Sequence, residues 1–346
     1  MAFKLGFKLN PILRRHGWAP KAGSDWDKSA TAKELSFWRE QGYEALELLP
    51  DHYTKEGFVF DVSDDEWRET KAVVDDSGMR IEGILGWRRM TFREPWASDQ
   101  EAELEKIAKI GEILEVNIID VQPVFSLPML PSPGAPTRQL FRSLWDATTA
   151  DFELSAQSLK RYAQRVRQFG ASLALQMHPD GLCDIPKSTF RLMEMIDEKN
   201  VGINPDTFDN AWIYPDYPSS VVPSAAEQCR MISPHVNYWH AKNWERSLGP
   251  DGLWKFSRRH LDEGDQPIGL MAQHLVAAGF DGAVIMECGR GFEYSVAPAT
   301  LIRSRDYLGW IRNVYAPEVP LRKYYGHFQP EVLAASAKAA GSTPGS

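Results

Sequence analysis

Apolar and polar residues follow one another along the chain in blocks that predict strands and helices in turn. Short runs of strand-forming residues predict eight strands, and a segment with helical periodicity follows each of them. The strands are expected at residues 4–9, 43–49, 80–85, 116–121, 172–176, 201–203, 236–240 and 282–287. The helices are expected at residues 31–43, from 63, from 98, and at 152–169, 187–197, 224–232, 267–278 and 298–314.

Three of the predicted helices begin with a Ser or Thr followed three residues later by Glu. In such a capping box, each side chain satisfies a backbone N–H that the first helical turn leaves without an acceptor. The three pairs are Thr31 with Glu34, Ser63 with Glu66, and Ser98 with Glu101.

Eight strand–helix units predict a (β/α)8 TIM barrel of the α/β class. A doubly wound sheet would use the same units, but the chain has no Gly-rich phosphate-binding turn to support one. We therefore expect one barrel domain over residues 1–315. Residues 316–346 are expected to form a C-terminal extension with a disordered, small-residue tail.

Two connections are long, at residues 127–149 and 244–265. Long connections without secondary structure are usually functional or disordered. Both follow predicted strands, so both are expected on the catalytic face of the barrel, where the carboxyl ends of the strands meet.

Candidate chemistry lies at that same face, because four successive strands end in groups that can bind a metal ion. These groups are Gln176, Asp206, His240 and Glu287. The mixed nitrogen and oxygen donors suit Mn2+, Mg2+, Co2+ or Zn2+. We take Mn2+ as the first candidate.

Each of these residues also has a structural explanation when it is taken alone. Glu287 could pair with Arg290, and His240 could pack in the core after two aromatic residues. Asp206 follows Asn-Pro, an ordinary turn sequence, and Gln176 could simply be a polar strand end. The joint placement of all four at one end of successive strands favours the metal site.

The ordered set of segments resembles the xylose-isomerase-like barrel superfamily of sugar isomerases, epimerases and related lyases. The resemblance implies that Gln176, Asp206, His240 and Glu287 are the metal ligands. The segments that carry it are residues 4–7, 42–48, 173–178, 201–207, 240–243, 263–265 with 279–282, and 285–287.

One residue departs from the superfamily pattern, which usually has Glu where this chain has Gln176. A glutamine can bind a cation through its carbonyl oxygen, but it adds no negative charge and accepts no proton. Metal affinity should therefore be lower. Epimerisation by two opposed bases is disfavoured, whereas an elimination that needs one base remains possible.

Further candidates surround the predicted ligands. His178 lies on the same side of an extended strand as Gln176, and its ordinary pKa suits a general base near neutral pH. A packed histidine is the structural alternative. Three charged residues are expected to bind sugar hydroxyls or a carbonyl oxygen, unless they are merely solvated: Asp209, Lys242 and Arg290.

Three tryptophans beyond the strand ends could stack on a planar aglycone: Trp87, Trp244 and Trp254. With a single base, they make the chain resemble the catalytic α subunit of C-glycoside deglycosidases. That resemblance implies cleavage of a carbon–carbon bond in 3-oxo-C-glycosides by elimination, with His178 as the base. It also implies a small β subunit and a hetero-oligomer.

Two alternatives to this lyase hypothesis remain open. The first is a keto-sugar isomerase or epimerase in which Glu287 is the only strong base. The second is a non-catalytic sugar-binding barrel in which Gln176 marks lost catalysis.

Composition narrows the possible partners and compartment. The net charge of −8 gives no general electrostatic support for nucleic-acid binding, including DNA repair by endonuclease relatives of this barrel. Three cysteines cannot form a disulfide framework, and no apolar run approaches the length of a membrane span. We expect a cytoplasmic protein.

Overall fold

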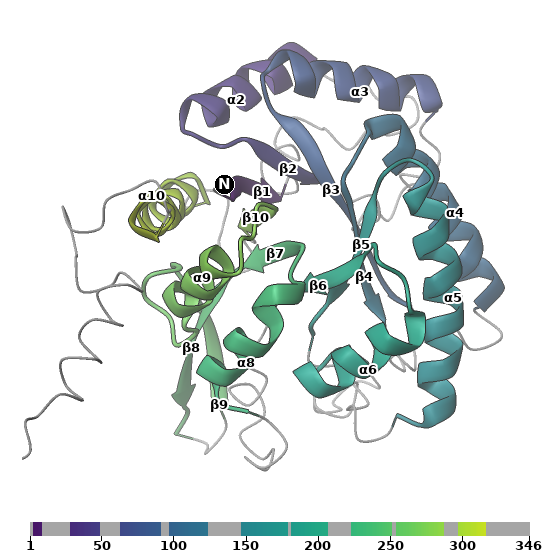
Figure 1. The fold of residues 1–346 in the computed structure, drawn as a ribbon. Coiled ribbons are helices and arrows are strands. Elements are labelled where there is room, and N and C mark those ends of the chain that lie inside the picture. Colours follow the sequence, from purple (N-terminus) through teal and green to yellow (C-terminus); the bar gives the residue numbers. More distant parts are fainter. Residues whose placement is uncertain are drawn as a thin grey trace, which may run out of the picture.

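A parallel sheet closes on itself at the centre of the molecule (Figure 1). The computed structural model describes residues 3–8, 28–48, 63–90, 97–123, 147–178, 181–206, 223–250, 254–286 and 297–315. The strands of this sheet are β1 (Lys4–Lys8), β2 (Ala45–Leu48), β3 (Arg80–Met90), β4 (Ile118–Pro123), β5 (Ser172–Gln176), β6 (Val201–Asn204), β7 (Tyr238–Ala241) and β10 (Ala283–Met286). Their order is β6-β5-β4-β3-β2-β1-β10-β7.

The two ends of this order meet between β6 and β7, so the ring is complete. Ile203 forms a parallel bridge with Val236, and the Asn237 backbone N–H donates to the Ile203 carbonyl oxygen at 3.3 Å. The Asn237 side chain also donates to the Leu173 carbonyl oxygen of β5 at 2.9 Å. The predicted TIM barrel is therefore confirmed.

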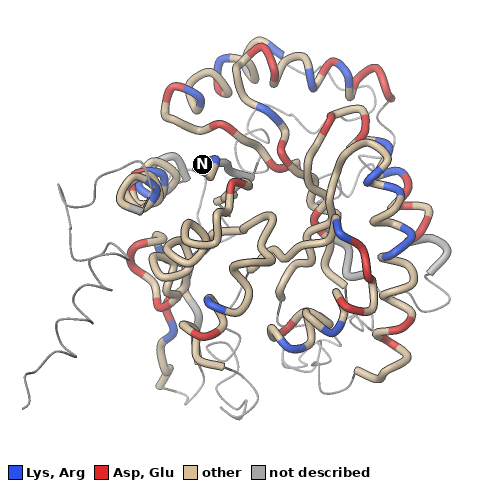
Figure 2. The backbone as a smooth tube through the Cα atoms, viewed as in Figure 1, with Lys and Arg blue, Asp and Glu red and all other residues tan. Residues whose placement is uncertain are grey.

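Helices surround the strands in the order expected for a barrel (Figure 1). Charged residues lie along these outer helices (Figure 2). No helix in the described ranges has the length and hydropathy needed to cross a membrane. The helices are α2 (Lys28–Glu40), α3 (Asp64–Asp76), α4 (Ala97–Leu114), α5 (Thr149–Arg167), α6 (Pro186–Ile196), α8 (Ala225–Ile232), the 3-10 turn η5 (Ser233–His235), α9 (Ile268–Ala277) and α10 (Ala297–Tyr315).

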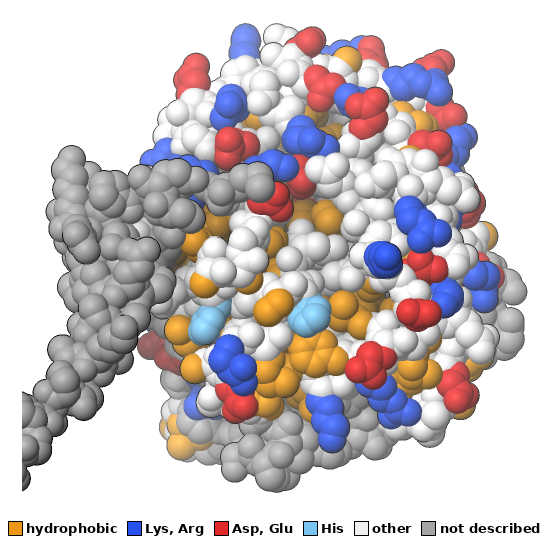
Figure 3. Space-filling view, viewed as in Figure 1, with side chains coloured by type: hydrophobic (Ala, Val, Ile, Leu, Met, Phe, Trp, Pro, Cys, Tyr) orange, Lys and Arg blue, Asp and Glu red, His pale blue; other side chains and the backbone are white. Residues whose placement is uncertain are grey.

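The main hydrophobic core fills the layer between strands and helices. Large side chains such as Trp38, Trp67 and Trp239 are almost completely buried in it. The charged faces of α3, α4 and α5 point to solvent, while more hydrophobic side chains reach the surface between α6 and α8 (Figure 3). A second, smaller hydrophobic cluster is formed by residues of the barrel strands themselves, among them Ile118, Tyr238 and Ile285.

The helix starts agree only partly with the predicted capping boxes. Ser63 caps α3 as predicted, because its Oγ accepts from the Glu66 N–H and Glu66 accepts from the Ser63 N–H. The boxes at Thr31 and Ser98 are wrong, since α2 begins at Lys28 and α4 at Ala97. Thr31 is buried inside α2, so tertiary packing extends that helix toward the N-terminus, beyond the predicted start signal.

The connection predicted at 244–265 is not a structureless loop, and that prediction is wrong. It folds into an antiparallel hairpin of β8 (Asn243–Leu248) and β9 (Trp254–Arg259), which projects below β7 in Figure 1. Asn243 holds its base, donating to the Leu261 and Gln266 carbonyl oxygens at 2.8 and 3.3 Å. Turn residues at 249–252 between two short runs are a hairpin signal that explains the fold.

Two other predicted segments are not tested. Residues 124–146 of the first long connection lie outside the described residues, and so does the expected extension at 316–346.

Candidate metal centre

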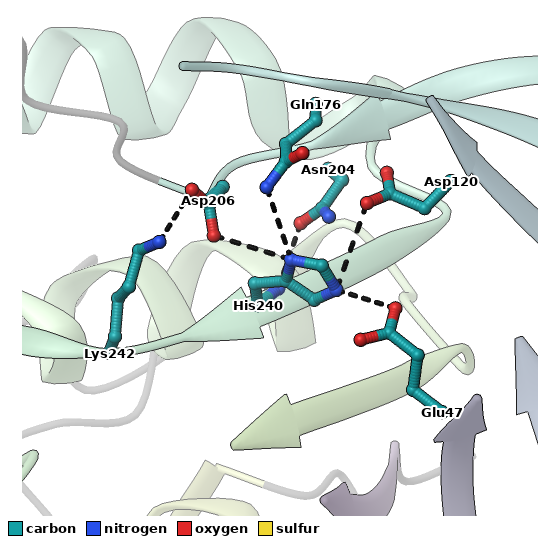
Figure 4. A network of polar contacts seen from close by, with 7 residues as sticks. All are labelled: Glu47, Asp120, Gln176, Asn204, Asp206, His240 and Lys242. Carbon is teal, nitrogen blue, oxygen red and sulfur yellow. Dashed lines mark hydrogen bonds and ion pairs between the residues drawn. The ribbon is translucent and has the colours of Figure 1, made fainter. Parts of the chain in front are cut away.

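His240 lies at the centre of a buried polar cluster inside the barrel (Figure 4). It belongs to β7, whose residues are all buried. Its backbone N–H donates to the Asn204 side-chain oxygen of β6 at 2.8 Å. This bond links β6 and β7, the two strands that close the barrel, and fixes the position of the imidazole relative to β6.

On its Nδ1 side, the imidazole faces residues from the ends of β5 and β6. Asp206 Oδ1 lies 3.3 Å from Nδ1, and the Gln176 amide nitrogen lies 3.5 Å from it. The other oxygen of Asp206 accepts a hydrogen bond from Lys242 Nζ at 2.6 Å. Three of the four predicted ligands therefore come together in the structure.

On its Nε2 side, the imidazole faces two carboxylates from β2 and β4. Glu47 Oε1 lies 2.7 Å from Nε2, and Asp120 Oδ2 lies 3.8 Å from it. The ligand atoms of Glu47, Asp120 and His240 all lie within 4.8 Å of one another. These residues form a buried Glu/Asp/His triad with a spacing that could hold a metal ion.

The cluster carries more negative than positive charge. The carboxylates of Glu47, Asp120 and Asp206 are buried around the His240 imidazole, and the Lys242 ammonium pairs with Asp206. A buried charge is costly unless it is paired or binds a metal. The Gln176 carbonyl oxygen is also buried without a hydrogen-bond donor in the described part of the chain. The donor set therefore fits a divalent cation.

Tyr238, two residues before His240, forms the layer beneath the cluster. Its ring meets the His240 ring edge-on, with centroids 5.4 Å apart. A Cβ at Gly83 would lie 2.7 Å from the Tyr238 hydroxyl, so only glycine leaves room for it. Burial raises the pKa of Tyr238 well above its ordinary value, and the charges of Glu47 and Asp120 add to the shift. The hydroxyl therefore stays neutral.

The fourth predicted ligand, Glu287, lies outside the described residues. It directly follows β10, whose last residue, Met286, pairs with Ala241 of β7. Asp209 and Arg290 also lie outside the described residues, as do the side chains of Trp87 and Trp254.

Two further candidates are described, but their functions are not tested. His178 is half-buried just beyond β5, and its carbonyl oxygen accepts from the Gly181 N–H at 3.1 Å. Trp244 is half-buried at the base of the β8–β9 hairpin, where its backbone N–H donates to Asn243 Oδ1 at 2.8 Å.

Three residues of the cluster were not among the sequence candidates: Glu47, Asp120 and Asn204. Glu47 and Asn204 are each the single polar residue of their strand, and Asp120 shares the otherwise apolar strand β4 with Gln122. Parallel strands of a barrel are buried on both faces, so a lone carboxylate within one must find a partner in the interior. That signal could have identified Glu47 and Asp120.

Comparison with known proteins agrees with this architecture. A family model described as xylose isomerase-like TIM barrel matches residues 35–310. No curated protein matches the chain.

Several solved structures share the fold over almost the whole chain. A xylose isomerase-like TIM barrel protein from Mycobacterium smegmatis, in complex with magnesium, is 19% identical with a TM-score of 0.67, covering 90% of this chain and 96% of that one. A D-psicose 3-epimerase in the presence of D-fructose is 14% identical (TM-score 0.59; coverage 90% and 99%). A probable 3-DHS dehydratase from Bacillus anthracis is 16% identical (TM-score 0.59; coverage 89% and 99%). At these identities, the likeness shows the fold alone.

Proposed function

Because the chain belongs to the xylose isomerase-like TIM barrel family, we propose that it is a divalent-metal-dependent isomerase of keto sugars. It would remove a proton from the carbon next to the substrate carbonyl. The observation that carries the proposal is the buried group of His240, Asp206 and Gln176 at the carboxyl ends of β5, β6 and β7. The solved epimerase with D-fructose supports the substrate class.

The proposed metal ligands are His240 Nδ1, a carboxylate oxygen of Asp206, Glu287 and the carbonyl oxygen of Gln176. The Gln176 amide would turn this oxygen toward the ion in place of the nitrogen that faces Nδ1 in the structure. The separation of 3.3 Å between Nδ1 and Asp206 Oδ1 supports this set. Two ligands of one ion at about 2.1 Å lie about 3.0–3.4 Å apart in octahedral or tetrahedral geometry. When bound, the cation supplies Lewis-acid polarisation of the substrate carbonyl.

Glu287 is the proposed base, and the reaction needs only one. Its carboxylate takes the proton from the carbon next to the carbonyl, which leaves an enediolate. The same carboxylic acid then returns the proton to the former carbonyl carbon, while a hydroxyl proton moves between the two oxygens. Asp209 and Arg290 are proposed to bind the sugar hydroxyls.

Gln176 favours isomerisation over epimerisation within this proposal. Inversion at one carbon needs a second group that exchanges a proton on the opposite face. An amide cannot accept that proton at neutral pH. A 1,2-shift on a single face avoids this requirement.

Proton exchange tests the proposal directly. The purified chain with Mn2+ would be incubated in D2O with D-fructose, D-psicose, D-tagatose or L-ribulose, and the sugars analysed by NMR. We expect deuterium at the carbon next to the carbonyl in at least one sugar, together with its aldose. Absence of both aldose formation and deuterium exchange in all four, despite bound Mn2+, would overturn the assignment.

A second candidate is elimination from 3-oxo-C-glycosides, which Gln176 also permits. One base removes the proton at C2, and the aromatic aglycone leaves with the electron pair of the carbon–carbon bond and is protonated by an acid. The fold shared with a probable dehydratase is consistent with such a lyase. Trp87, Trp244 and Trp254 would stack on the aglycone, and a small β subunit in a hetero-oligomer would complete the enzyme.

Aglycone release separates the two candidates. If the lyase assignment is correct, the chain, with its β partner where one exists, releases aglycone from a 3-oxo-C-glycoside. His178→Ala should then lower kcat by about 10²–10⁴, the usual contribution of a positioned acid–base group. Deuterium exchange into free keto sugars without aglycone release would exclude the lyase.

A further inference from the structure

The two ring nitrogens of His240 face different acidic groups, and a neutral imidazole can bind a metal ion through only one of its nitrogens. In that form, one ring nitrogen carries a proton and the other a lone pair. Nε2 faces Glu47 and Asp120, whereas Nδ1 faces Asp206 and Gln176. The position of the proton therefore decides on which side of the ring the cation can be held.

The contact between Nε2 and Glu47 has the geometry of a hydrogen bond. Its length of 2.7 Å lies at the short end for N–H···O bonds to a carboxylate. It is also shorter than the separation of about 3.0 Å or more expected for two ligands of one ion. Glu47 is fully buried, as is His240, so water does not compete for this bond.

The opposite side of the ring has the features of an unprotonated nitrogen. The Gln176 amide nitrogen, which can only donate, faces Nδ1 at 3.5 Å. Asp206 Oδ1 lies 3.3 Å from Nδ1, longer than the bond from Nε2 to Glu47. Two groups with lone pairs facing each other at this distance favour a cation between them.

We infer that Glu47 is a positioning residue, which accepts the Nε2 proton of His240 and thereby directs the Nδ1 lone pair at the metal site. The inference rests on the proposed function for the presence of the metal, and it assigns to β2 the role of orienting the metal-binding histidine through Glu47. Glu47 and Asp120 then shape and charge the site from behind the imidazole. A carboxylate that orients a metal-binding histidine is usually worth about 10–100-fold in metal affinity.

The first test reads the position of the proton in the metal-free protein. Long-range 1H–15N correlation of the chain labelled with 15N-histidine distinguishes protonated from unprotonated ring nitrogens, and His240→Asn assigns the signals. We expect a protonated Nε2 and an unprotonated Nδ1. A protonated Nδ1 would overturn the inference. No variant has to fold for the wild-type spectrum to decide this point.

The second test compares two substitutions of Glu47 in Mn2+ affinity, measured by EPR of free Mn2+. Glu47→Leu removes both the charge and the acceptor, whereas Glu47→Gln removes the charge and keeps an amide oxygen that can accept from Nε2. We expect Glu47→Leu to weaken binding by about 10–100-fold and Glu47→Gln to recover much of that loss. Equal affinity of the two variants would contradict the inference.

A matched control distinguishes the effect of the position of Glu47 beside His240 from the general effect of removing a buried negative charge. Glu82 is also a buried acid in the barrel, but it pairs with Lys4 and Arg80 and contacts Asn117 instead of His240. Glu82→Gln should leave Mn2+ affinity close to wild type, and a loss as large as that of Glu47→Leu would overturn the inference. Failure of the keto-sugar assay would count against the proposed function, whereas the spectrum of the metal-free protein still reports on Glu47.

Discussion

Lys242 donates a hydrogen bond to Asp206 at 2.6 Å inside the barrel, and both side chains are almost completely buried. The ammonium engages one oxygen of the carboxylate, while the other oxygen faces His240 Nδ1 at 3.3 Å. One carboxylate oxygen of Asp206 is thus held by the Lys242 ammonium, and the other faces the candidate metal position.

Removing this ammonium should destabilise the metal-free protein. Lys242→Met leaves Asp206 buried without its counter-charge, and the loss of one partner of a buried pair typically costs about 3–5 kcal/mol. Urea unfolding in the presence of a chelator measures the loss. The double variant Lys242→Met/Asp206→Asn should lose less than the sum of the two single changes, and additive losses would argue against the pair.

Substitutions of Gln176 should change metal affinity in opposite directions. Gln176→Glu adds a negative charge and should tighten Mn2+ binding, yet turnover need not rise because a more negative site weakens the Lewis acid. Gln176→Met, of similar length but without the amide oxygen, should weaken binding. Calorimetry with Mn2+ measures both, and unchanged affinity in both variants would remove Gln176 from the ligands.

The layer beneath the site should not tolerate a side chain at Gly83. Gly83→Ala places a Cβ 2.7 Å from the Tyr238 hydroxyl and 3.0 Å from its Cζ, and overpacking of this kind costs about 1–3 kcal/mol. In a Tyr238→Phe background the cost should be smaller. Gly309→Ala, on α10 with open space around it, is the control and should not destabilise the fold.

The capping box of α3 should give a pH-dependent contribution to stability. Hydrogen bonds from the Ser63 backbone N–H and then from its hydroxyl lower the pKa of Glu66. A lowered folded-state pKa stabilises the fold above the unfolded-state value, and this stabilisation is lost as the pH falls through the folded-state value.

Ser63→Ala should therefore cost about 0.5–2 kcal/mol near neutral pH, and the difference from wild type should shrink in acid as Glu66 is protonated. Chemical denaturation across that pH range measures it. A difference that stays constant down to acid pH would show that the Glu66 carboxylate takes no part.

The fold could be predicted from the sequence because the strands are marked by strong local patterns. The structure confirms β5 at its predicted bounds and the other barrel strands within a few residues. The hairpin of β8 and β9 was missed, since six-residue strands rich in charged residues resemble a polar loop. Its fold depends on Asn243, which satisfies backbone groups 18 and 23 residues away along the chain.

From the sequence, residues were placed in the candidate site only where a polar residue ends a strand. Gln176, Asp206 and His240 were found in this way, because barrel topology alone brings strand ends together. Glu47 and Asp120 lie within apolar runs, and their meeting with His240 depends on strand register and barrel closure across the ring. Local patterns contain no information on that geometry.

The Mn2+ content of the reloaded protein tests the metal-ligand claim most directly. Metal-free wild-type protein and the variants Asp206→Ala, His240→Ala and Glu287→Ala would be loaded with Mn2+, freed of excess metal by gel filtration and subjected to elemental analysis, with Glu82→Gln as control. We expect one Mn2+ per chain in the wild type and the control, and loss of most of the Mn2+ in each of the three variants. Near-wild-type Mn2+ in any two of those variants would contradict it.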